Sequence, residues 1–227
     1  MRNLADLLSN DPAWPILCQW ISEAKNKVEV LPATDPDRSD ALLQLQVTTR
    51  SPMGAVVYET GGILVDSGWI RLLGSGHPRL PRTLPDWNLG RTCQDDGCAP
   101  SILIVADDVV GGTFAINGGD FNGAPGQVYY FAPDSLAWES LDFGYSDFLN
   151  WVFNGDLAQF YQGQRWPQWQ DEVRALPGDR GFYFYPNLWA KGPPLEQRVR
   201  SAVPMAELYG LQLDFQRQMA KEVPAAE

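Results

Sequence analysis

Short apolar runs separated by tight turns dominate the middle of this chain. Between residues 101 and 141, four runs rich in β-branched and aromatic residues alternate with turns that contain Gly, Pro and Asp. Turns this short permit hairpins, whereas a parallel crossover needs about a dozen residues or more. The pattern therefore predicts four neighbouring antiparallel strands of one sheet, at residues 101–106, 113–117, 128–131 and 138–141.

Apolar residues at helical spacing flank this strand-rich region on both sides. Asp11-Pro12 and Ser51-Pro52 each have the form of an N-cap followed by Pro at the first helical position. The spacing predicts helices at 12–26, from 52 to the Gly61-Gly62 pair, from 146 onward and from 204 onward. We expect one face of the third helix to pack on the sheet through Phe148, Leu149, Val152 and Phe153.

The pattern of apolar residues before residue 74 predicts further strands. Leu43, Leu45 and Val47 alternate with polar residues, which is typical of a half-buried strand. Short strands are also predicted at 28–31, 63–65 and 69–73, the last two joined by a three-residue turn. Because the strands come in hairpins, the fold class is α+β, a mostly antiparallel sheet flanked by helices. With no repeat or long linker, we expect residues 1–227 to form a single domain.

Composition places the chain among globular proteins with a large core. Nine Trp residues are present, and each large ring can remove roughly 150–250 Å² from water when buried. No apolar run approaches the roughly 20 residues that span a bilayer, and we expect no membrane association. Three Cys residues without an export signal predict reduced thiols and a cytoplasmic protein.

Charge is distributed unevenly along the chain. The net charge is −11, which argues against nucleic-acid binding because that function needs a basic face. No Lys or Arg occurs from Thr92 to Gln164, a stretch with ten acidic residues. Most of these carboxylates should reach solvent, and the arginines best placed to neutralise some of them are Arg165, Arg174, Arg198 and Arg200. We interpret the stretch either as a solubility feature or as a surface for a basic partner.

Seven segments together resemble an uncharacterised bacterial family catalogued as domain of unknown function 2625. They are DSGWIRLLGSGHPRLPR, VADDVVGGTFAINGG, VYYFAPDSLAWESLDFGYSDFLNW, GDLAQFYQ, RWPQW, GFYFYPNLW and SAVPMAELYGLQLDFQRQ. The resemblance covers almost the whole chain. It implies a cytoplasmic bacterial protein and supplies no activity, because none is assigned to the family.

Residues 100–162 are similar to a second group, the SUKH superfamily of toxin-immunity proteins and cell-wall regulators. The similarity rests on a strand, an acid-Gly turn, a second strand, a Tyr-rich hairpin and a Ser-led helix with Phe-Leu. It implies an antiparallel SUKH-like core used for protein binding rather than chemistry. The first 90 residues do not match the usual pattern of that superfamily, and no functional residue is carried over.

Two polar pairs are the candidates for chemistry. Ser75 and His77, the single histidine, would point to the same side of an extended segment, as a nucleophile and its base require. The G-x-S-x-G elbow is absent, and the surrounding Gly and Pro also explain this passage as a turn. Asp107 and Asp108 follow the most β-like run and are typical either of a turn or of an acid/base or metal-ligand pair.

Metal and cofactor motifs are weak throughout. Residues 117–123 lack the further acids and the bidentate Glu of a calcium loop. Cys93 and Cys98 would need Cys18 or acidic residues to complete a zinc site. No phosphate-binding or dinucleotide fingerprint is present. We therefore expect neither a metal nor a cofactor.

The sequence leaves three functional interpretations open. The first is a non-catalytic protein-interaction module, immunity-like in the sense of the SUKH resemblance, whose acidic surface binds a basic protein; its candidate contacts are Asp107, Asp108, Asp120, Asp134, Arg165, Trp166 and Trp169. The Arg-Trp cluster equally fits a helix fixed to the core. The second is an enzyme with a polar centre of Ser75, His77, Asp107 and Asp108. The third is a small-ligand pocket lined by Trp and Tyr.

Overall fold

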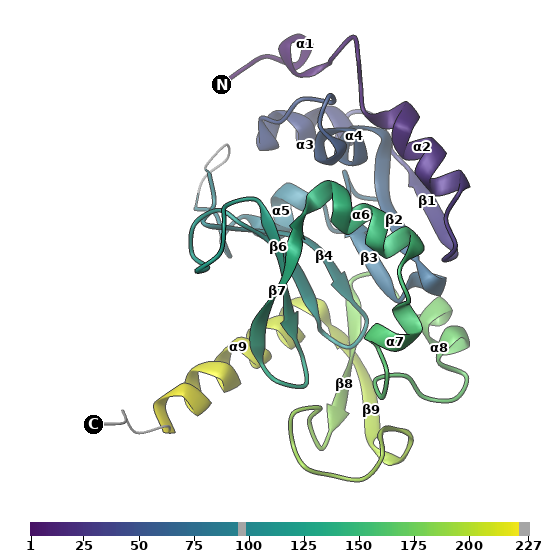
Figure 1. Cartoon of the computed structure of the whole chain (residues 1–227), viewed down its shortest axis with the longest axis vertical. Helices are drawn as coiled ribbons and strands as arrows, with labels where there is room; N and C mark the ends of the chain where they lie inside the picture. Colours follow the sequence, from purple (N-terminus) through teal and green to yellow (C-terminus); the bar gives the residue numbers. More distant parts are fainter. Residues whose placement is uncertain (95–98, 223–227) are drawn as a thin grey trace.

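The protein is built around one seven-stranded antiparallel sheet (Figure 1). The structure, a computed structural model, describes residues 1–94 and 99–222. The strand order follows the sequence, and each strand pairs with the next. The strands are β1 (Val28–Pro32), β2 (Thr60–Val65), β3 (Ile70–Leu73), β4 (Ile102–Asp108), β5 (Thr113–Asn117), β6 (Gln127–Ala132) and β7 (Ala137–Gly144).

Helices that come before and after the central strands pack on the sheet and on one another. α4 contacts β2, α6 contacts β6 and β7, and α2 contacts both of these helices. The helices of the body are α1 (Leu4–Leu7), α2 (Trp14–Ser22), α3 (Asp37–Leu45), α4 (Pro52–Glu59), α5 (Leu84–Asn88), α6 (Tyr145–Asn154), α7 (Leu157–Phe160) and α8 (Trp169–Ala175). The architecture is therefore an α+β fold with helices flanking an antiparallel sheet.

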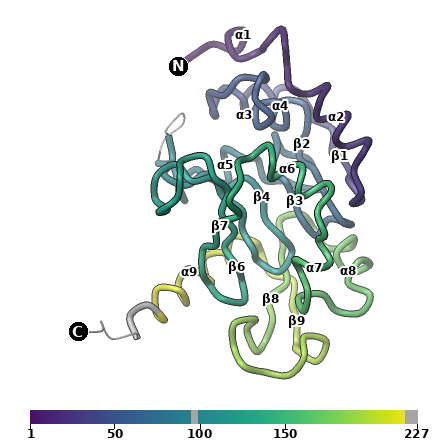
Figure 2. Tube along the Cα trace, in the orientation of Figure 1, coloured from purple at the N-terminus to yellow at the C-terminus, as the bar shows by residue number. Residues whose placement is uncertain are grey.

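A second, two-stranded sheet follows the helical region. It pairs β8 (Arg180–Tyr185) with β9 (Val199–Pro204), with the short 3₁₀ helix η2 (Leu195–Gln197) between them. The last helix, α9 (Met205–Glu222), packs against both strands. Figure 2 shows α1 at one end of the molecule, with β8 and β9 at the other.

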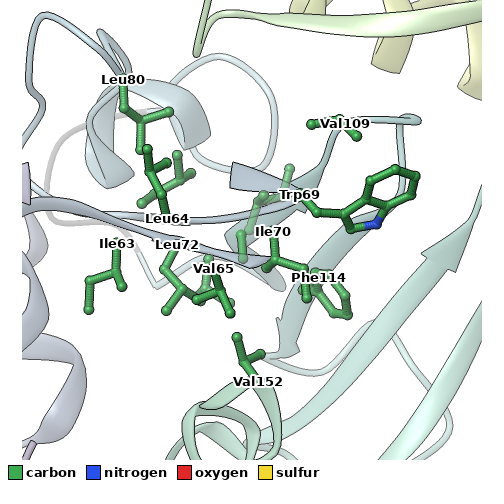
Figure 3. Close-up of a cluster of buried hydrophobic side chains, with 14 of the residues drawn as sticks. Ile63, Leu64, Val65, Trp69, Ile70, Leu72, Leu80, Val109, Phe114 and Val152 are labelled. Atoms are coloured by element: carbon green, nitrogen blue, oxygen red, sulfur yellow. The ribbon is translucent and has the colours of Figure 1, made fainter. Parts of the chain in front are cut away.

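The core lies between the main sheet and its helices (Figure 3). Trp69 is fully buried, and its ring lies 5.3 Å from Tyr161 and 4.9 Å from Trp169, centroid to centroid. Phe114 on β5 lies 5.0 Å from Phe148 on α6. All four residues expected on the sheet-facing side of the third predicted helix are buried, which confirms that side of α6.

The hairpin prediction is confirmed. The four runs between residues 101 and 141 are β4, β5, β6 and β7, and they are consecutive antiparallel neighbours. The β2–β3 hairpin also forms, closed by the 3₁₀ turn η1 (Asp66–Gly68).

Three predictions before residue 63 are wrong. Asp11-Pro12 does not begin the first predicted helix, because α2 begins at Trp14 with Ala13 as its N-cap. The alternation of Leu43, Leu45 and Val47 indicated a strand, but Asp37–Leu45 forms α3, with Asp37 and Asp40 placed in its first turn to stabilise the helix dipole. A five-residue alternation is too short to separate the strand period from the helical one.

Gly61 lies in strand β2 instead of ending the preceding helix, which stops at Glu59. A Cβ added to Gly61 would lie 2.4 Å from the carbonyl oxygen of Gly76. Only glycine therefore allows the 75–77 segment to approach the strand this closely.

Candidate functional site

Asp107 is held inside the protein by two arginines. Asp107 is 1% exposed, and its carboxylate accepts a hydrogen bond from Nε of Arg71 at 2.8 Å. The same carboxylate forms an ion pair with Nη1 of Arg82. Arg71 and Arg82 also donate to the carbonyl oxygen of Gly178, at 3.3 and 2.8 Å. This buried cluster joins β3 and β4 to the α8–β8 connection. Asp107 is therefore not exposed to a partner, which corrects its expected place on a binding surface.

Asp108, the next residue of β4, has a different set of partners. Its Oδ2 accepts hydrogen bonds from the hydroxyls of Tyr130 and Tyr161 at 2.8 and 3.2 Å. Its Oδ1 accepts from the backbone N–H groups of Val110 and Gly112 at 3.0 and 2.8 Å. Burial raises the pKa of Asp108 to about 6, although these hydrogen bonds oppose the rise. Asp108 is fully buried and also lies away from any partner-binding surface.

The Ser75-His77 passage lines an open recess of about 420 Å³. Ser75 is buried and donates from Oγ to the carbonyl oxygen of Thr60 at 2.9 Å. Nδ1 of His77 accepts from the backbone N–H of Arg79 at 3.1 Å. Neither Asp107 nor Asp108 lines this recess, whose carboxylates are Asp37, Asp40 and Asp86. The four residues of the expected polar centre are therefore not gathered in one cavity.

No cluster of three or more His, Cys, Asp or Glu side chains in the described part of the chain has the geometry of a metal site. Cys18 has a free, exposed thiol. Cys93 is disulfide-bonded, so the expectation of reduced thiols is wrong for this residue. Cys98, together with Asp95 and Asp96, lies outside the described residues.

The Arg-Trp cluster belongs to the core. Arg165 pairs with Asp66 at 2.6 Å, and its guanidinium lies 4.3 Å from the centre of the Trp169 ring. Trp166 is 2% exposed and donates from Nε1 to Glu172 at 3.0 Å. Trp169 is also buried. These contacts favour the packing interpretation over a partner-binding one.

Between Thr92 and Gln164, the described acidic residues other than Asp107 and Asp108 are exposed. We refer to these six exposed residues together as the acidic surface: Asp120, Asp134, Glu139, Asp142, Asp147 and Asp156. None of the six belongs to a salt bridge within residues 1–94 and 99–222. Their polar contacts are to neighbouring hydroxyls and backbone, as in the 2.7 Å bond from Ser101 to Asp120.

The four arginines expected to neutralise this stretch do not reach the acidic surface. Arg165 pairs with Asp66, Arg174 with Asp171, and Arg200 with Glu172. Arg198 donates to backbone carbonyl oxygens, including that of Asn187. That expectation is wrong, and none of the four arginines forms an ion pair with the six carboxylates.

Sequence reasoning missed Arg71 and Arg82, although one of them left a signal. Arg71 interrupts the apolar run from Trp69 to Leu73, and a charged residue inside a buried strand needs a buried partner. The partner could not be identified from the chain alone, because Asp107 is 36 residues away.

Comparison with known proteins places the chain among uncharacterised relatives. The model of a family described as "Protein of unknown function DUF2625" matches residues 4–208. The uncharacterised protein YbfG of Escherichia coli (strain K12) is 47% identical over 213 residues, covering 93% of this chain and 96% of YbfG. An uncharacterised protein of Haemophilus influenzae (strain Rd) is 47% identical over 189 residues, covering 83% of each chain. None of the helices in the described residues is both long and apolar enough to cross a membrane.

Proposed function

We propose that this chain, which belongs to the DUF2625 family of proteins of unknown function, is a non-catalytic protein-interaction module that binds a basic protein. The observation that carries the proposal is the acidic surface, whose six exposed carboxylates have no cationic partner among the described residues. A surface in this state produces a negative field that attracts a basic protein and repels nucleic acid.

The position of β7 supports the proposal. Among residues 1–94 and 99–222, β7 is the last strand of the main sheet, and one of its two edges has no neighbouring strand. Glu139 and Asp142 lie on it and are exposed, and Asp134 lies in the turn that leads to it. An extended segment of a partner can add to such an edge through backbone hydrogen bonds, while its Lys or Arg side chains meet the carboxylates.

Charged residues on an edge strand also prevent aggregation, so solubility is the competing explanation for the acidic surface. The two explanations differ in one respect. A solubility feature requires only net charge, whereas a binding surface requires charge at these positions. The immunity-like role implied by the SUKH resemblance of residues 100–162 stays a prediction within this proposal.

The catalytic alternative receives no such support. The carboxylate oxygens of Asp107 already accept hydrogen bonds from Arg71 and Arg82. Those of Asp108 accept from two tyrosine hydroxyls and two backbone N–H groups. Ser75 donates to a backbone carbonyl oxygen and has no contact with His77 that would make it a nucleophile. We therefore propose no reaction.

A pull-down with matched charge variants tests the proposal. The surface variant combines Asp120→Asn, Asp134→Asn, Glu139→Gln and Asp142→Asn. The control variant removes four exposed carboxylates elsewhere, through Glu23→Gln, Asp86→Asn, Glu196→Gln and Glu207→Gln. The two variants carry the same net charge. We expect wild type and control to retain the same basic protein from native lysate, and the surface variant to lose it. Equal retention by all three proteins would contradict the proposal.

A further inference from the structure

A second recess, which we call the arginine pocket, lies where the β2–β3 turn, the 78–81 segment and the α8–β8 connection meet. It has a volume of about 290 Å³. Three arginines, Arg71, Arg79 and Arg174, line it together with a single acid, Asp179. In a protein with a net charge of −11, a pocket wall with this excess of cations is unusual.

Arg71 forms the buried cationic part of the pocket wall. Behind the wall, Arg71 and Arg82 both contact the carboxylate of Asp107, and the carboxylate of Asp108 also interacts with Arg71. Arg71 uses its donors on Asp107 and on the carbonyl oxygens of Asp108, Gly178 and Arg180. It therefore contributes charge to the pocket and no free N–H group. A fixed cation in a pocket wall favours an anion in the pocket.

Arg79 and Arg174 supply the donors at the mouth of the pocket. Their side chains are 53% and 51% exposed, and they pair with Glu29 and Asp171. Exposed ion pairs of this kind contribute little stability, so the two guanidinium groups can exchange these partners for a ligand. Both can bind an oxyanion through two parallel N–H groups.

The β2–β3 turn adds a hydroxyl to the same wall. Asp66, Ser67 and Gly68 have consecutive positive φ angles of 52°, 65° and 92°. Two non-glycine residues in the left-handed region are strained, and strain of this kind concentrates at ligand-binding sites. The turn places Ser67 on the pocket wall, with Oγ 3.3 Å from Nη2 of Arg174.

We propose that the arginine pocket binds a small molecule through its phosphate group. Arg79, Arg174 and Ser67 contact the phosphate oxygens, and Arg71 contributes the field of the buried wall. The volume accommodates a phosphate group together with a small organic body. None of the six residues of the acidic surface lines this pocket, so the proposed ligand site does not depend on the proposed protein partner.

An NMR titration of the ¹⁵N-labelled protein with glycerol 3-phosphate, at constant ionic strength, tests the site. We expect saturable shifts of the Ser67 and Gly178 amides. Arg79→Gln and Arg174→Gln should each weaken binding about tenfold, because each removes a charge-assisted contact. Glu29→Gln should tighten binding, because it releases Arg79 from its competing carboxylate.

Arg217→Gln is the matched control. Arg217 is exposed and pairs with Asp214 three residues earlier, as Arg174 pairs with Asp171, but it does not line the pocket. This variant should bind like wild type. Linear shifts without saturation, or equal weakening by Arg217→Gln and Arg174→Gln, would overturn the proposal. Tighter binding of glycerate than of glycerol 3-phosphate would overturn the assignment of the ligand group as phosphate.

Discussion

Asp107 and Asp108 are consecutive residues of β4, yet guanidinium groups hold the first carboxylate and tyrosine hydroxyls hold the second. Side chains of successive strand residues point to opposite faces of a sheet. The end of β4 therefore supports two buried clusters with different partners. The first joins the sheet to the α8–β8 connection through Gly178, and the second joins β4 to β6 and to the end of α7 through Tyr130 and Tyr161.

Asp107→Asn should destabilise the protein strongly. The substitution removes the carboxylate that Arg71 and Arg82 both contact, and breaking a buried ion pair typically costs about 3–5 kcal/mol. Urea unfolding measures the loss. Asp171→Asn, which removes the exposed partner of Arg174, is the control and should leave stability nearly unchanged. Similar curves for the two variants would show that the Asp107 cluster is not a structural centre.

Asp108 should make stability depend on pH in an unusual direction. Its pKa rises from 3.8 to about 6 on folding, so the native state binds a proton that the unfolded state has released. The resulting stabilisation is complete below about pH 4 and is lost as pH rises through about 6; it amounts to about 3 kcal/mol at most.

Asp108→Asn removes this titration. The unfolding free energy of wild type relative to Asp108→Asn should therefore decrease between about pH 4 and 6 and stay constant above that range. A difference that stays constant across the whole range, or one that grows with pH, would contradict the raised pKa of Asp108.

Phe148→Ala should destabilise the fold by roughly 3–5 kcal/mol, because it leaves a cavity between α6 and the sheet. Phe148 is fully buried against Phe114. Ile16→Ala on α2 is the comparison, since Ile16 is 48% exposed and loses little contact. Chemical denaturation of both variants checks the expectation. If Phe148→Ala lowers the free energy of unfolding by less than about 1 kcal/mol, Phe148 is not a core residue.

The local spacing of apolar residues predicted much of the sheet. It did not predict the buried polar side chains and their partners. The hairpins of β4 to β7 follow from short turns between apolar runs, and the burial of Phe148 follows from helical spacing. The burial of Asp107 does not follow from local pattern, because it depends on Arg71 and Arg82, which reach it only in the folded chain. An acid shortly before Gly-Gly is compatible both with a turn and with a buried ion-pair cluster, and the sequence does not distinguish them.

For the acidic surface, the exposure of the carboxylates could be predicted from the sequence, but the pairing of the arginines could not. That most carboxylates of the arginine-free stretch reach solvent follows from the cost of burying unpaired charge. That Arg165, Arg174 and Arg200 pair elsewhere depends on nearer acids, namely Asp66, Asp171 and Glu172, whose positions only the fold determines.

The central claim is that the acidic surface binds a basic protein, and the association rate of the captured partner tests it most directly. The rate is measured from about 0.01 M to about 1 M salt, over which the Debye length falls from about 30 Å to about 3 Å. For wild type and the control variant we expect the rate to fall about tenfold or more. The surface variant should associate slowly at every salt concentration. A wild-type rate that does not change with salt, or a captured partner that is itself strongly acidic, would contradict the account.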